Sequence, residues 1–135
     1  MALTVSSATV SGTSYTSCSA NEGGGVVLES SSVTVSDTSY TSCSADNSGG
    51  GMALYDSSSA IVSGTSYTNC SADYRGGGMA LFSSSSATVS DTSYTSCSAG
   101  EYGGGMALYD SSATVSGTSY TSCSADNSGG GMALY

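Results

Sequence analysis

Residues 103–110 read GGGMALYD, and the organisation of the whole chain follows from this stretch. The same words return at residues 49–56, and at residues 129–135 without the aspartate, while Met-Ala-Leu opens the chain at residues 1–3. Three consecutive glycines usually interrupt regular structure, whereas the apolar residues behind them are typical of a short buried strand. A break and an apolar segment that recur together indicate a tandem repeat rather than a flexible linker.

A second motif, Ser-Tyr-Thr, occurs once in each copy and so gives the number of copies. Its tyrosines are separated by 25, 27, 27 and 26 residues, and a cysteine follows each tyrosine by three positions. The tyrosines are Tyr15, Tyr40, Tyr67, Tyr94 and Tyr120. The cysteines are Cys18, Cys43, Cys70, Cys97 and Cys123. Residues 1–135 therefore hold five in-phase copies of one unit, which we expect to form a single repeat segment.

Small length differences between the copies locate the loops. The segment between each cysteine and the next apolar run varies by one residue, and so does the Asp-Ser-Ser segment, as loops permit and packed strands do not. Three pieces keep a constant length: Ala-Thr-Val, Ser-Tyr-Thr-Ser-Cys and Met-Ala-Leu-Tyr. Alternation in the first piece predicts that Ala8 and Val10 face inward and Thr9 outward. We therefore expect an all-β solenoid, a parallel β-helix of five coils with three short strands in each.

The turn between the first two pieces alternates between glycine and aspartate. The alternating residues are Gly12, Asp37, Gly64, Asp91 and Gly117. Stacked coils lie about 4.8 Å apart, so alternation keeps two carboxylates from lying directly above one another. Glycine and aspartate are also both ordinary turn residues, which is the simpler interpretation.

The two phrases resemble the paired repeat motifs of the polymorphic outer membrane protein family, in which Phe-x-x-Asn is paired with Gly-Gly-Ala and an aliphatic residue. Residues 94–97 (Tyr-Thr-Ser-Cys) correspond to the first motif and residues 104–108 (Gly-Gly-Met-Ala-Leu) to the second. The resemblance extends over the whole chain. It implies a right-handed parallel β-helix at a cell surface, with an adhesive or structural role. Tyrosine here replaces phenylalanine, cysteine replaces asparagine, and methionine enters the glycine motif.

Composition excludes several classes of function. The chain carries ten acidic residues and one basic residue, Arg75, for a net charge of -9, so nucleic acid is not an expected partner. No apolar run approaches the roughly 20 residues of a membrane helix, so membrane insertion is not expected. Histidine and lysine are absent from the sequence, and the acidic residues lie in variable loops. We therefore predict no enzyme, no catalytic residues and no cofactor.

In-register stacking predicts that the tyrosines and the cysteines named above form two ladders inside the coils. Neighbouring cysteine Cα atoms would lie within disulfide range, but parallel Cβ atoms would lie slightly too far apart. A reduced ladder of small apolar side chains is the favoured interpretation, and a cross-linked one stays open. Zinc is not expected because a straight column cannot surround an ion tetrahedrally, and solvated turns explain the acidic loops better than calcium does.

Hydroxyl groups flank every tyrosine of the Ser-Tyr-Thr phrase and are expected to face outward. They belong to Ser14, Thr16, Ser39, Thr41, Ser66, Thr68, Ser93, Thr95, Ser119 and Thr121. Such a grid resembles the threonine arrays of ice-binding β-solenoids, although serine and threonine are also ordinary soluble surface residues. A sequon for N-glycosylation, Asn69-Cys70-Ser71, stands in the third copy, where the other copies carry serine in place of the asparagine.

Taken together, the sequence predicts a non-enzymatic structural or adhesive segment that forms a rod or filament outside the cell or at its surface. The expected partners are copies of the chain stacked end to end, glycans or other surface proteins. An ice-binding solenoid is the alternative. The first and last copies are cut in the same phase, which predicts an uncapped part of a longer repeat protein or a unit that stacks into a fibre.

Overall fold

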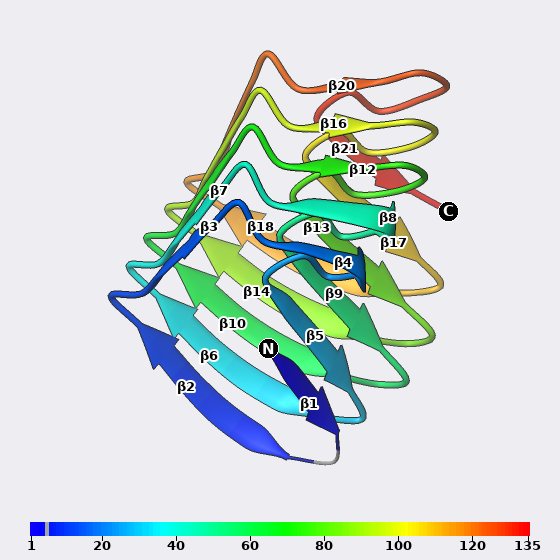
Figure 1. Ribbon diagram of the computed structural model, residues 1–135. Coiled ribbons are helices and arrows are strands. Elements are labelled where there is room, and N and C mark those ends of the chain that lie inside the picture. The colour runs from blue at the N-terminus through cyan, green and yellow to red at the C-terminus, as the bar shows by residue number, and fades with distance from the viewer. Residues whose placement is uncertain (5) are drawn as a thin grey trace.

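Each copy of the repeat forms one circuit of short strands, and each circuit lies on the one before it (Figure 1). This computed structural model describes residues 1–4 and 6–135. All strand pairs are parallel and join successive coils, with like residues opposite one another; in one such pair Val62 lies opposite Val89. The expected all-β parallel solenoid of five coils is confirmed, and the described residues contain no helix.

Two of the four sheets form the broad walls of the solenoid. Sheet A contains β1 (Ala2–Thr4), β5 (Val26–Glu29), β9 (Met52–Tyr55), β13 (Met79–Phe82), β17 (Met106–Tyr109) and β21 (Met132–Leu134). Sheet B contains β2 (Ser7–Ser11), β6 (Ser32–Ser36), β10 (Ser59–Ser63), β14 (Ser86–Ser90) and β18 (Ser112–Ser116).

The other two sheets are narrower, with several strands of only two or three residues. Sheet C contains β3 (Ser14–Thr16), β7 (Ser39–Thr41), β11 (Ser66–Thr68), β15 (Ser93–Thr95) and β19 (Ser119–Thr121). Sheet D contains β4 (Ser19–Glu22), β8 (Ser44–Ser48), β12 (Ser71–Ala72), β16 (Ser98–Ala99) and β20 (Ser124–Ala125).

Sheet D corrects one expectation, because each coil contains four strands and not three. The segment after each cysteine was expected to be a loop because its length varies. It begins, however, with Ser-Ala in every copy, and these two residues pair between coils, for example Ala72 with Ala99. The segment that varies in length follows the Ser-Ala pair. In the first pair of strands, β4 with β8, this position is a register shift between Ala20 and Glu22. The invariant Ser-Ala pair was the signal for the fourth strand.

Apolar side chains fill the interior in columns along the solenoid. Val33 and Val35 of β6 are buried while Thr34 between them is exposed, which is the alternation predicted for this strand. In sheet A, Met52 and Leu54 face the core, yet Ala53 between them is buried as well. The glycine loop folds over the outer side of sheet A and packs against the alanine, so this strand is covered on both faces.

At the corner between sheets B and C, two aspartates lie against the glycine of the next coil. Asp37 and Asp91 adopt a left-handed backbone, with φ of 47° and 46°. The Asp37 carboxylate leans over the next coil, where its Oδ1 would lie 2.7 Å from a Cβ on Gly64. Oδ1 of Asp91 would lie 2.5 Å from a Cβ on Gly117 in the same way. Each aspartate thus fills the space that a side chain of the next coil would need.

The triple glycine is a tight crossing and not a flexible break. The third glycine lies against a tyrosine ring of the next coil, because a Cβ on Gly78 would lie 2.6 Å from Cδ1 of Tyr94. The second glycine passes close to backbone carbonyls of that coil. Only hydrogen in place of a side chain permits this approach.

A single methyl group at this crossing is expected to destabilise the fold. The ring of Tyr94 is packed between two other rings and cannot withdraw, so Gly78→Ala should lower the free energy of unfolding by about 3 kcal/mol. Gly12→Ala is the matched control: its φ of 55° strains alanine, but no atom lies within 4 Å of the new Cβ. That variant should lose about 1 kcal/mol. Urea unfolding measures both, and equal losses would contradict the close approach.

Candidate functional site

The tyrosines of sheet C stack in one column inside the solenoid. Successive ring centroids are 4.7 to 4.9 Å apart and the ring planes differ by 3° to 9°. Tyr40, Tyr67 and Tyr94 are fully buried, while Tyr15 and Tyr120 in the outer coils are partly buried. The backbone ladder fixes the ring spacing, so the parallel stack follows from placing the same residue at the same position of every coil.

Burial makes these phenols hard to ionise. Among the described residues, the hydroxyl groups of Tyr40, Tyr67, Tyr94 and Tyr120 are buried and have no hydrogen-bond partner in the protein. Loss of water around the ring raises the pKa of Tyr120 to about 12. It raises the pKa values of the three tyrosines between Tyr15 and Tyr120 further still. The column therefore stays neutral, and it contributes apolar surface instead of a reactive group.

The cysteines form a second column at the corner between sheets C and D. All five thiols are free, and those of Cys43, Cys70 and Cys97 are fully buried. The Cys43 thiol donates to the carbonyl of Tyr15 at 3.4 Å, and Cys70, Cys97 and Cys123 repeat this contact one coil later each time. Burial raises the pKa of Cys43 to about 11, so its thiol is protonated at neutral pH.

Alkaline solution should unfold the solenoid cooperatively. The unfolded chain has cysteines near pKa 9.0 and tyrosines near 10.0, and burial raises the pKa to about 11 for Cys43 and to about 12 for Tyr120. The unfolded chain therefore loses protons first. Stability is fully present below about pH 9 and falls as the pH rises through 11 to 12.

Circular dichroism and phenolate absorbance, followed through the same pH series, test this expectation. The buried phenols should ionise together with the loss of β-structure. Tyr67→Phe is the control, because it removes one buried phenol and should move the transition to higher pH. Ionisation of all ten tyrosines near pH 10 with the fold intact would contradict it.

The predicted hydroxyl grid lies on the outer side of sheet C. Ser39 and Thr41 flank the buried Tyr40 and are both half-buried, and the corresponding residues of β11 and β15 are placed alike. In β3 and β19 the serine and the threonine are exposed. The Ser39 hydroxyl donates to that of Ser14 at 3.0 Å, so hydroxyl groups of adjacent coils lie within hydrogen-bonding reach.

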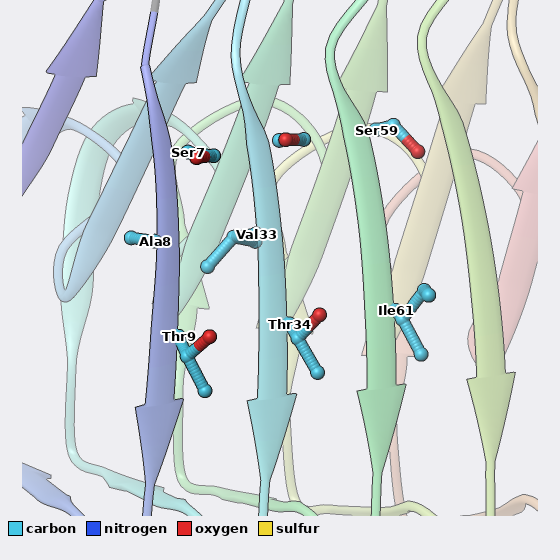
Figure 2. A pocket seen from close by; sticks show the side chains of 8 residues that line it. Ser7, Ala8, Thr9, Val33, Thr34, Ser59 and Ile61 are labelled. Carbon is cyan, nitrogen blue, oxygen red and sulfur yellow. The ribbon is translucent and has the colours of Figure 1, made fainter.

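Sheet B adds a wider hydroxyl surface, of which the sequence predicted the outward Thr9 but not the grid as a whole. Its outward residues are Ser7, Thr9, Ser11, Ser32, Thr34, Ser36, Ser59, Ile61, Ser63, Ser86, Thr88, Ser90, Ser112, Thr114 and Ser116. Figure 2 shows Thr9, Thr34 and Ile61 in one row across three strands. These three residues help to line an open hollow of about 380 Å³. The serines that begin and end every copy of this strand were the available signal.

We call the outer sides of sheets B and C together the hydroxyl face. None of the strands that form it contains a charged residue. Asp37 and Asp91 are exposed at the corner between sheets B and C and therefore lie within the hydroxyl face, whereas Asp56 and Asp110 lie at its border with sheet A. The strands of the hydroxyl face are thus free of charge, and the two carboxylates within the face are confined to the corner between its sheets.

A comparison with protein families agrees with this geometry. The model of the right handed beta helix region matches residues 1–135, which is the whole chain. The chain belongs to the right-handed β-helix family. Neither a curated protein nor a solved structure matches it. The expected handedness is therefore confirmed, and the family accounts for the fold of every coil.

The remaining side of this right-handed β-helix carries most of the charge. The Arg75 guanidinium lies 3.7 Å from the Glu101 carboxylate and about 5.8 Å from the centre of the Tyr102 ring. Two coils before Arg75, the Glu22 carboxylate accepts hydrogen bonds from Asn47 and Tyr55 of the coil between them. In the described part of the chain, no three His, Cys, Asp or Glu side chains are placed to hold one metal ion. The same residues include no helix long and apolar enough to cross a membrane.

Asn69 of the sequon lies at the exposed corner between sheets C and D. Its φ is 52°, and the serines at the corresponding corners have φ of 52° to 54°. Asparagine adopts this left-handed conformation more readily than most residues, so the local backbone suits it. The side chain is exposed, whereas Cys70 beside it is fully buried.

Proposed function

We propose that this β-helix is a non-enzymatic structural or adhesive segment that forms a rod outside the cell, with the hydroxyl face as its contact surface. One observation carries the proposal: outward hydroxyl groups repeat from coil to coil on sheets B and C, interrupted at Ile61, and the strands that carry them contain no charged residue. The resemblance to polymorphic outer membrane proteins supports a place at the cell surface. The exposed Asn69 is a candidate site for a glycan there.

The hydroxyl face suits a neutral polysaccharide as its partner. Its side chains both donate and accept hydrogen bonds, as sugar hydroxyls do, and they repeat at the coil spacing of 4.7 to 4.9 Å. Thr9, Thr34 and Ile61 add methyl groups that can pack on apolar sugar faces. Except at the corner that carries Asp37 and Asp91, a partner on this face also avoids the desolvation of ionic groups that a charged surface would require.

Self-association is the second expected interaction. The outermost strands of each sheet, β2 and β18 in sheet B, each have a neighbour on one side only. Such edges can pair with the edges of another copy.

Charge placed on the hydroxyl face should weaken polysaccharide binding. The double variant Thr34→Lys/Thr88→Lys puts two ammonium groups on exposed positions of sheet B, and we expect at least about tenfold weaker binding to immobilised neutral polysaccharides. The control Asn21→Lys/Asn127→Lys adds the same charge at exposed positions outside this face and should bind like the unaltered chain. Equal binding by both variants, or none by the unaltered chain, would contradict the proposal.

Ice binding is the alternative function, and the breadth of the hydroxyl face favours it. Sheet B adds a column of threonines, interrupted by Ile61, to the two columns expected on sheet C. If the alternative holds, the chain should show thermal hysteresis and shape ice crystals. The two lysine variants serve here as well, since only the one on sheet B should lose activity. No thermal hysteresis at millimolar concentration would exclude ice binding.

A further inference from the structure

The five cysteines share one environment along the whole rod. In four of the coils the sulfur lies 3.4 Å from the tyrosine carbonyl of the preceding coil. In all five it lies 3.7 Å from the carbonyl of the threonine two residues before it. Identical contacts mean that the coil translation relates the sulfur atoms to one another. Their spacing is therefore that of the stacked tyrosines, 4.7 to 4.9 Å.

Neighbouring thiols in this column lie close enough to influence one another. Contact between Cys70 and Cys97 lowers the pKa of the first thiol and raises that of the second, so ionisation of one depends on the other. A disulfide needs Cβ atoms about 3.8 Å apart, which is shorter than the coil spacing, and all five cysteines are free. The column thus places pairs of sulfur atoms at a fixed distance that is too long for a covalent bond between them.

That distance fits a metal ion held between two sulfur atoms. A metal–thiolate bond measures about 2.3 Å, so two such bonds in line span about 4.6 Å. Each gap offers two sulfur ligands and no third His, Cys, Asp or Glu among the described residues, which does not suit a tetrahedral ion. Thiolates select soft ions such as Cu(I), a closed-shell cation that accepts two ligands in a linear arrangement.

We propose that the cysteine column is a binding site for soft monovalent cations, each held linearly between the thiolates of adjacent coils. Two thiols lose their protons when one cation binds, two metal–sulfur bonds form, and no atom changes its oxidation state. Each sulfur serves one cation, so five thiols bind two cations and leave one thiol free. Cys18 and Cys123, the partly buried ends of the column, are the points of entry.

Titration of the reduced chain with Cu(I), supplied without oxygen as its acetonitrile complex, tests the site. Native mass spectrometry should show two bound ions, and four protons should be released. X-ray absorption should show two sulfur neighbours for each copper and no other ligand. No binding, or copper with three or four sulfur neighbours, would overturn the proposal.

Single substitutions distinguish binding between adjacent coils from binding that depends only on the number of thiols. Cys70→Ala leaves two adjacent pairs, Cys18 with Cys43 and Cys97 with Cys123, so it should still bind two ions. Cys43→Ala isolates Cys18 and leaves three adjacent thiols, so it should bind one ion. Both variants remove one fully buried thiol and retain four. Equal stoichiometry in the two variants would refute binding between adjacent coils.

Circular dichroism of each variant shows whether the solenoid is intact. If an alanine variant loses its β-structure, serine at the same position keeps the volume of the side chain, and the same two stoichiometries are expected. The metal titration tests the cysteine column, and the lysine variants test the hydroxyl face. The metal proposal and the proposed function can therefore fail independently of each other.

Discussion

In-register stacking of identical coils is the constraint on which the rest of this structure depends. Parallel ladders join every strand to the strand one coil away, and they hold each residue above its counterpart at a fixed spacing. A single coil could not offset the entropy of ordering some 26 residues, because it buries only a few apolar side chains. Stacking supplies the missing surface by covering Tyr67 with Tyr40 on one side and Tyr94 on the other.

The same constraint explains why the repeat tolerates so little variation at its crossings. The third glycine of each triplet must admit a ring of the next coil, and the carboxylates of Asp37 and Asp91 occupy the space above the next turn. At that turn, an aspartate of one coil thus lies against the glycine of the next. Length changes are confined to two segments of each coil. One follows the Ser-Ala strand of sheet D, and the other connects sheet A to sheet B.

Any surface built this way consists of columns instead of a single site. A residue type placed once in the repeat appears five times along the rod, so the hydroxyl face and the cysteine column are both linear arrays. Linear arrays suit extended partners, such as a polysaccharide or an ice plane, and ligands that need two identical groups at the coil spacing. Both proposals follow from this geometry.

The sequence by itself determined the parallel solenoid, its five coils and the inward tyrosines, because periodic apolar residues can be buried together only if the copies stack in register. It did not reveal sheet D, since Ser-Ala is too short to show a strand period and pairs only because the neighbouring coils hold it. It also left unseen the hydroxyl face of sheet B, the carboxylate of Asp37 above Gly64 and the contacts of the thiols. These features depend on contacts between one coil and the next. Such contacts are set by distances in space, and the spacing of residues along the chain does not show them.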